Sequence, residues 1–395
     1  MNDSFIDVDF AQRSKHTQHV SGDVFVTRKI KEETRTLSVL SDGLGSGVKA
    51  SVLANMTAAM AIKYTSAFVD VRKSAKTIMD TLPICEVRKI SYSTFTIADL
   101  DDDDGTARFI EHGNPPLVLF RGPEELPLEK ASIQLAEWKD RVISYAETQL
   151  QLGDRVLFFS DGISQSGMEQ RNMPMGWGRA AAKAYASEAI RQTPDIASRQ
   201  LAAMLVDRAH TNDLRKAKDD ITCGVIYYRR PRRLLVISGP PFSKERDAEL
   251  ATLVQTYAGK KAICGGTTAT IVSRLLQREV HMNIMDMEQF DPEVPPTSSM
   301  EGVDLITEGT LTLAKIAEML ERHVRPAPPR LNAAARLVQL MQASDVVDFV
   351  VGTRINDAHQ DPNLPVELDL RRNIIRKIAN LLEKIYLKNT SIQFL

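Results

Sequence analysis

Aspartates flanked by glycine or small residues recur where apolar runs of this sequence begin or end. The stretch "SVLSDGLGSG" (38–47) ends an apolar run with Ser-Asp-Gly, and "LFFSDGISQSG" (157–167) repeats that order. An isolated Asp-Gly pair is usually a turn, because Gly accepts a positive φ and Asp bonds its own backbone. The acids that share this placement at the ends of apolar runs are Asp23, Asp42, Asp161, Asp219 and Asp220.

The repetition of these acids favours a metal site over a set of turns. Several carboxylates at the ends of buried strands repel one another, and an unpaired buried charge is costly. Mg²⁺ or Mn²⁺ removes that cost, because such hard ions select carboxylate, carbonyl and water oxygens. Two ions that share a carboxylate can activate a water toward phosphorus. The glycine after Asp42 would then let the main-chain carbonyl of Gly43 approach an ion.

The elements that must position these acids differ between the two halves of the chain. Over residues 20–230, apolar strands form two predicted hairpins, 23–30 with 34–42 and 92–101 with 107–113. A long helix is expected over 48–68, largely buried, with Met56 and Met60 in the core. Sequential hairpins and helices predict an α+β fold in which helices cover antiparallel sheets.

The pattern changes at "RRPRRL" (229–234). After it, apolar strands alternate with helices, which predicts an α/β domain with a parallel sheet covered on both faces. The predicted loops of this half include 291–302 and 325–330. With 395 residues, two domains are the default, and we assign them to residues 1–230 and 232–395.

Composition narrows the function classes. The formal net charge is −1, so no basic surface predicts binding of nucleic acid or anionic membrane. No apolar run approaches a membrane span, and the first residues do not read as a secretion signal. The three cysteines, Cys85, Cys223 and Cys264, lack metal-type spacing. We therefore expect a cytoplasmic protein.

Five segments over residues 21–222, taken together, resemble the SpoIIE-like bacterial branch of the metal-dependent type 2C (PPM) serine/threonine protein phosphatases. They are "SGD", "SDGLGSGVKAS", "GNPPLVL", "GDRVLFFSDGI" and "KDDIT", in that order. The resemblance implies an αββα sandwich for residues 1–230 with two Mn²⁺ or Mg²⁺ ions. It also implies hydrolysis of phosphoserine or phosphothreonine on a phosphoprotein substrate, in bacterial signalling.

The resemblance also implies roles for individual residues. Asp42 would bridge both ions and the Gly43 carbonyl would bind one of them. Asp161 and Asp219 would complete the shell of the second ion, and Asp23 would act directly or through water; Asp220 is the alternative ligand beside Asp219. The chain departs from eukaryotic relatives at Gly22, where they carry an acid. Their phosphate-binding arginine has no clear counterpart, with Arg13 and Lys15 as the cations considered.

Small polar residues mark the strand ends of the second half, and stretches such as "CGGTTA" are similar to the tail of bacterial phosphatases of this branch. Ligands of open parallel sheets bind outside the carboxyl ends of the strands, and a helix start favours an anion. We expect a regulatory domain that senses a small anionic metabolite, although ordinary turns and caps would use the same residue types. The candidate ligand-binding residues are Gly265, Gly266, Thr267, Thr268, Glu308 and Gly309.

Two other functions remain open at this point. One is a non-catalytic signalling module that binds a phosphoprotein while its second domain senses a metabolite. The other is hydrolysis of a small phosphate ester by the same metal centre. The substrate, the ligand and the oligomeric state, for which a homodimer is one expectation, are not specified by these patterns.

Overall fold

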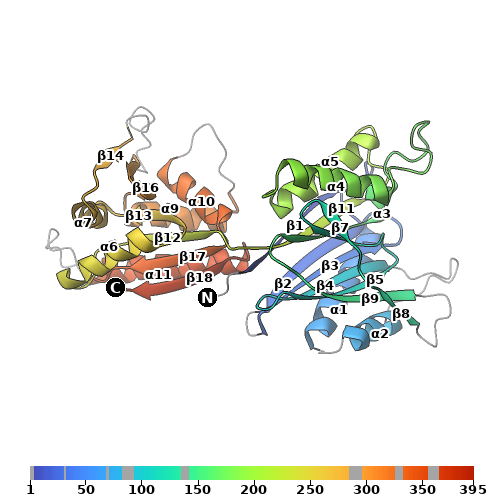
Figure 1. Ribbon diagram of the computed structural model, residues 1–395, viewed down its shortest axis with the longest axis horizontal. Helices are drawn as coiled ribbons and strands as arrows, with labels where there is room; N and C mark the ends of the chain where they lie inside the picture. The colour runs from blue at the N-terminus through green and yellow to red at the C-terminus, as the bar shows by residue number, and fades with distance from the viewer. Residues whose placement is uncertain are drawn as a thin grey trace. The chain divides into compact units, whose positions relative to one another are not determined.

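The chain divides into two compact units, Met1–Arg230 and Pro231–Leu395, which are described separately here (Figure 1). The computed structural model describes residues 4–30, 33–67, 71–81, 93–134, 142–283, 296–324, 332–354 and 364–395. Cys85, the loop predicted at 325–330 and part of the loop predicted at 291–302 lie outside these ranges.

Two antiparallel sheets make up the centre of the first unit. The six-stranded sheet has the order β2 (Asp23–Ile30), β3 (Arg35–Gly43), β4 (Ser93–Asp101), β5 (Thr106–His112), β9 (Val142–Gln149) and β8 (Ala131–Gln134). The five-stranded sheet has the order β1 (Phe5–Arg13), β11 (Ile221–Arg229), β10 (Asp154–Phe159), β6 (Val118–Arg121) and β7 (Glu124–Leu126). Both predicted hairpins are confirmed as β2–β3 and β4–β5.

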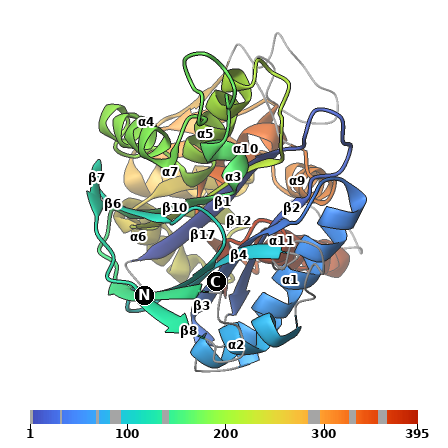
Figure 2. The same ribbon diagram turned by 90° about the vertical axis from the view of Figure 1, so that its right-hand side faces the viewer.

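Helices cover the outer face of each sheet. Helices α1 (Val48–Ala67) and α2 (Val71–Thr81) pack on the six-stranded sheet, and α4 (Arg179–Gln192) and α5 (Ser198–Asn212) on the five-stranded one (Figure 2). The short helix α3 (Asp161–Ser164) follows β10 directly. A third core, with Leu40, Phe109 and Phe158 fully or almost fully buried, fills the space between the sheets. The predicted αββα sandwich is therefore confirmed.

Helix α1 is less buried than its apolar sequence predicts. Val48, Val52 and Met56 are 68%, 52% and 54% exposed, so the prediction that Met56 is a core residue was wrong. The face against the sheet is a narrow stripe that includes Ala54 and Ala58, both fully buried. Small side chains allow the helix to lie close to the sheet, and a surface helix buries only one stripe.

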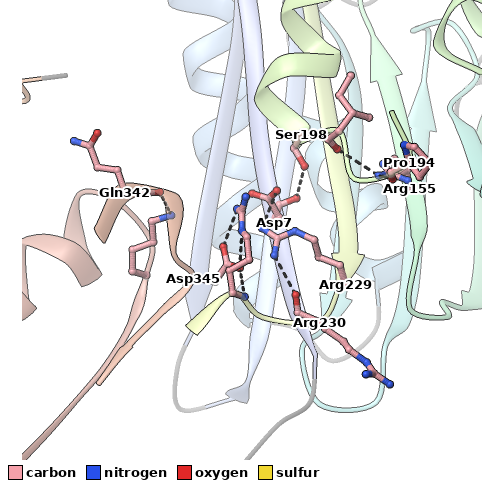
Figure 3. A network of polar contacts seen from close by, with 11 residues as sticks. Asp7, Arg155, Pro194, Ser198, Arg229, Arg230, Gln342 and Asp345 are labelled. Atoms are coloured by element: carbon pink, nitrogen blue, oxygen red, sulfur yellow. Dashed lines mark hydrogen bonds and ion pairs between the residues drawn. The ribbon is translucent and has the colours of Figure 1, made fainter. Parts of the chain in front are cut away.

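Polar contacts hold β1 to the elements around it (Figure 3). Asp7 forms an ion pair with Arg229 of the neighbouring strand β11 at 3.2 Å, and its carbonyl accepts a 2.9 Å hydrogen bond from the Ser198 hydroxyl at the start of α5. Arg155 of β10 donates to the Pro194 carbonyl at 2.6 Å. These contacts fasten the loop before α5 and the helix itself onto the five-stranded sheet.

A seven-stranded sheet forms the centre of the second unit. Its order is β14 (Val280–Met282), β15 (Ser298–Met300), β16 (Val303–Thr307), β13 (Lys260–Cys264), β12 (Arg233–Ser238), β17 (Val346–Val351) and β18 (Asn389–Phe394). The strands from β16 to β18 are parallel, as predicted, while β14 and β15 add an antiparallel edge. Strand β18 was not predicted.

Helices cover both faces of this sheet. The short 3₁₀ helix η2 (Lys244–Arg246) leads into α6 (Asp247–Thr256), which packs with α7 (Gly266–Leu276) on one face. The other face carries α9 (Thr310–Glu321), α10 (Ala333–Ala343) and α11 (Leu364–Lys384). The chain therefore winds first along one face and then along the other, and its direction reverses between β12 and β17. No described helix has the length and apolar character to cross a bilayer.

Candidate functional site

Strand pairing collects the predicted acids at one end of the sandwich. Asp23 begins β2 and lies opposite Asp42, at the end of β3, in the antiparallel ladder. Asp161 follows the last residues of β10, and Asp219 and Asp220 precede the neighbouring strand β11. The charges of all four other acids raise the pKa of Asp42, so the five side chains form one electrostatic cluster.

Burial and mutual repulsion raise the pKa of several of these carboxyl groups above the ordinary value. Burial, followed by the charges of Asp23 and the other acids, raises the pKa of Asp42 to about 9. Burial also raises the pKa of Asp23 to about 7, although hydrogen bonds from Ser160 and Thr222 oppose the shift. The pKa of Asp161 is raised too, first by burial and then by the charge of Asp219. Burial and like charge thus keep protons on these carboxyl groups above the ordinary pKa.

The donor set fits a hard divalent cation. Asp23 is 3% exposed and its Oδ2 is buried without a hydrogen-bond partner. Within the described residues, no three His, Cys, Asp or Glu side chains converge as a complete set of metal ligands. Mg²⁺ commonly binds through one or two carboxylates and keeps several waters. Carboxylates that surround a cation while water completes its shell are therefore consistent with Mg²⁺ or the similar ion Mn²⁺.

Asp219 and Asp220 differ in how their carboxylates are used. The Asp220 oxygens accept backbone N–H groups from Lys15 at 3.0 Å and from Gly22 at 2.9 Å, and the side chain is buried. The half-buried Asp219 has one oxygen, Oδ1, that accepts the N–H of Asp220 at 2.9 Å. Asp220 thus ties the segment before β2 to the start of β11, while Asp219 is better placed to bind an ion.

Two glycines allow the site segments to approach one another. A Cβ added to Gly43 would collide with the backbone carbonyl of Ala50, in the first turn of α1. A Cβ added to Gly162 would collide with the backbone carbonyl of Asp220. Glycine at these two positions is required by close packing against the backbone, whatever role the Gly43 carbonyl has toward an ion.

Sequence reasoning missed the polar side chains that support the acids. The Ser160 hydroxyl accepts the N–H of Thr222 at 3.1 Å, which joins β10 to β11 beside Asp161. Gln12 donates to the carbonyl of Asp23 at 2.9 Å and to the Thr222 hydroxyl at 3.0 Å. The Ser-Asp-Gly repeat was a signal for Ser160, but no local pattern marks Gln12, because its partners are distant in sequence.

The structure distinguishes Lys15 from Arg13, the two cations that the sequence analysis considered for binding phosphate. The charge of Lys15 lowers the pKa of Asp219, against the larger effect of burial that raises it, so this lysine lies within reach of the acid cluster. Arg13 instead pairs with Asp207 at 3.0 Å, and both side chains are exposed. Lys15 is therefore the better placed of the two to meet an anion at the acids.

The candidate ligand residues of the second unit form a separate group at the carboxyl ends of β13 and β16. Gly265 precedes α7 with φ 131° and donates its N–H to the Thr307 carbonyl at 2.9 Å. The Glu308 carboxylate accepts the N–H of Leu311 at 3.2 Å, so it caps the start of α9 itself. This cap already brings a negative charge to that helix start.

We predict that the metal-free protein loses stability as pH rises. The folded chain retains protons on Asp42 and Asp23 that the unfolded chain releases near the ordinary pKa of 3.8, so the free energy of unfolding falls from that pH toward about 9. Chemical denaturation with a chelator at several pH values measures this slope.

Asp42→Asn should flatten that slope, whereas the exposed control Asp207→Asn should not. A slope that stays the same in Asp42→Asn would show that this carboxyl group does not carry the effect. Added Mn²⁺ should reverse the trend, because metal binding competes with protons and strengthens as pH rises.

A second prediction separates the adjacent acids. Asp220→Ala removes the acceptor of two backbone N–H groups and should destabilise the fold by about 1–3 kcal/mol. Asp219→Ala should leave stability nearly unchanged and weaken Mn²⁺ binding instead. Urea denaturation and a calorimetric Mn²⁺ titration of both variants check this. The opposite assignment would hold if Asp220→Ala lost metal affinity while keeping full stability.

Comparisons with known proteins place these observations in a family. A family model described as Stage II sporulation protein E (SpoIIE) matches residues 32–229, half of the chain. Stage II sporulation protein E of Bacillus subtilis (strain 168) is 26% identical over 144 residues, which are 36% of this chain and 17% of that protein. The protein of the same name from Priestia megaterium is 21% identical over 170 residues, 43% of this chain and 29% of that protein.

The matched regions thus cover less than a third of either relative. A solved structure of the phosphatase domain of SpoIIE from Bacillus subtilis aligns with 58% of this chain and 95% of that domain, at 19% identity and a TM-score of 0.45. The family model covers β3 through β11 and includes four of the five clustered acids. The chain therefore belongs to the SpoIIE family.

Proposed function

We propose that this chain hydrolyses phosphoserine or phosphothreonine on a protein, with two Mn²⁺ or Mg²⁺ ions held by its clustered aspartates. The observation that carries the proposal is the strand pairing that sets Asp42 opposite Asp23 and brings the ends of β10 and β11, with their acids, together. Burial and the four neighbouring carboxyl groups raise the pKa of Asp42. A cation bound among these carboxylates would reduce their repulsion and so stabilise the fold. Membership in the SpoIIE family supports the reaction class.

Each acid has a part that follows from its place. Asp42 lies opposite Asp23 across the ladder and is within electrostatic reach of Asp161 and Asp219, so we assign it as the acid that both ions would share. Asp161 and Asp219 would bind the second ion, and Asp23 the first, directly or through water. When bound, the ions supply Lewis-acid activation of water and neutralise charge on the phosphate.

The remaining residues position this set and receive the substrate. Gln12 donates to the backbone carbonyl of Asp23 and to the Thr222 hydroxyl, and Asp220 accepts the N–H of Gly22, the preceding residue. Lys15 is the cation that acts on the cluster, so we assign it to the phosphate oxygens of the substrate. An ammonium group binds phosphate as a point charge and does not require the planar geometry of a guanidinium.

The proposal also includes a protein substrate and a role in signalling. The acids do not specify one phosphoester by themselves, and we propose the second unit as the regulatory part. Hydrolysis of phosphoserine peptides and of an aryl phosphate, each with and without Mn²⁺, tests the function. Turnover of the aryl phosphate alone would indicate a small-ester hydrolase, and binding of the peptides without turnover would indicate a signalling module.

Asp42→Asn is predicted to lower Mn²⁺-dependent hydrolysis on the order of 10²–10³-fold. The change removes a charge placed between both ions, so it should cost more than replacing any other acid of the cluster. Steady-state kinetics at saturating Mn²⁺ measures this. Circular dichroism should show a folded protein, since the variant also relieves repulsion, and unchanged turnover would reject the assignment of Asp42.

Lys15→Gln is predicted to raise KM for a phosphopeptide about tenfold, equivalent to about 1.4 kcal/mol, with a smaller effect on kcat. The matched control is Arg13→Gln, which removes a nearby exposed cation that pairs with Asp207. Inhibition by inorganic phosphate should weaken in parallel for the lysine variant. Equal kinetics for the two variants would mean that Lys15 does not contact phosphate.

A further inference from the structure

The sheet of the second unit changes character at the carboxyl ends of its strands, on the face that α9 and α11 cover. Leu234 and Val236 of β12 lie in the core beneath these helices, so strand alternation places Ser238 on the same face. The register pairs Ser238 with Cys264, and Cys264 with Thr307. Small polar side chains therefore follow the apolar core residues along this row.

Two hydroxyl groups at this end are buried and have no partner. Ser238 is 1% exposed and Thr312 is fully buried, and neither side-chain oxygen makes a hydrogen bond with any residue that the structure describes. Thr312 lies in the first turn of α9, one turn before Ile316, which packs into the core, so its side chain faces the sheet. A buried hydroxyl group without a partner is costly, and a bound polar ligand would remove that cost.

Two arginines lie at the same strand ends. Arg371 precedes Ile375 by one turn on the sheet-facing stripe of α11, and a Cβ added to Gly239 would lie 2.5 Å from its Nη1. Arg354 follows β17 and donates its N–H to the Pro240 carbonyl at 3.2 Å. The Nη1 of Arg354 is buried without a hydrogen-bond partner. Guanidinium groups and unpartnered hydroxyls thus come from four elements at one edge.

The location is also the point where the winding of the sheet reverses. Strands β12 and β17 are neighbours, but the helices after them cover opposite faces. Open α/β sheets bind ligands outside the strand ends at such a point. The segment after β12, "SGPPFSKERD", lacks the Gly-x-Gly-x-x-Gly pattern that holds a dinucleotide, which leaves a smaller anion as the better fit.

We propose that Ser238, Thr312, Arg354 and Arg371 form a binding site for a small molecule that carries a phosphate group. A phosphate presents several oxygens in a tetrahedral arrangement, which suits donors that arrive from β12, α9, α11 and the end of β17. Arginine supplies charge-assisted hydrogen bonds to such an anion. The nearby carboxylate of Glu308 accepts the N–H groups of Leu311 and Thr312 through one oxygen, Oε2.

This site differs from the loop 265–268 that the sequence singled out. That loop offers the N-terminus of α7 and open space around Gly266, but no buried side chain there lacks a partner in the described structure. The site at the end of β12 combines guanidinium groups with unsatisfied hydroxyls. It is independent of the proposed phosphatase activity, because its residues belong to the second unit.

The test is calorimetric titration of the full chain with inorganic phosphate in the presence of a chelator, so that no metal-bound anion contributes. Binding is expected in the wild type and in Asp42→Asn. Arg371→Gln should weaken it about tenfold or more, and Arg371→Lys should restore part of the affinity. Ser238→Ala should weaken it less. The matched control Arg322→Gln, which removes an arginine directly after α9 whose side chain is 73% exposed, should bind as the wild type does.

Titration with a nucleoside monophosphate and with a sugar phosphate distinguishes a phosphorylated metabolite from free phosphate: tighter binding of either compound, still sensitive to Arg371→Gln, identifies the metabolite class. Circular dichroism and melting curves establish that each variant is folded. The proposal is overturned if the folded wild type does not bind any of the three anions. It is equally overturned if Arg371→Gln and Ser238→Ala bind them as tightly as Arg322→Gln.

Discussion

Asp23 and Asp42 lie opposite one another across an antiparallel ladder, where like charges repel, and the rest of the first unit is arranged around that repulsion. Strands β10 and β11 bring Asp161, Asp219 and Asp220 to the same place, so the strain accumulates at one end of the sandwich. Buried charge of one sign is stable only with a counter-charge or with protons. The raised pKa values of Asp42 and Asp23 mean that protons neutralise these carboxylates when no metal ion is bound. A divalent cation would neutralise them instead.

The scaffold tolerates this arrangement because its cores and backbone contacts lie outside the cluster. Three apolar layers, one between the sheets and one under each pair of helices, stabilise the sandwich without help from the acids. Asp220 is the exception, since its carboxylate is spent on two backbone N–H groups. Asp220 therefore positions the backbone of the site, and the carboxylates of the other acids remain available to bind an ion. Functional sites commonly contain such supporting residues beside those that bind.

The second unit uses the same kind of placement with the opposite charge. In both units, a strand end carries a buried polar atom without a hydrogen-bond partner among the described residues: Oδ2 of Asp23 in the first unit and the Ser238 hydroxyl in the second. The clustered carboxylates of the first unit favour the binding of cations. The hydroxyl and guanidinium groups that we propose as a site in the second unit favour the binding of an anion. A protein with both would carry one site for chemistry and one for a ligand on separate folds.

The sequence by itself determined both hairpins and the change of fold class near residue 230, and it singled out the acids as candidates, because these follow from local periodicity and short motifs. Only the tertiary structure decided which acid is spent on the backbone, that Lys15 rather than Arg13 lies near the cluster, and that Met56 faces solvent. It also decided that β18 joins the sheet and that Arg371 of α11 lies beside Gly239 at the end of β12. The reason is physical: those outcomes depend on contacts between residues far apart in the chain, and no local pattern encodes the partner of a side chain.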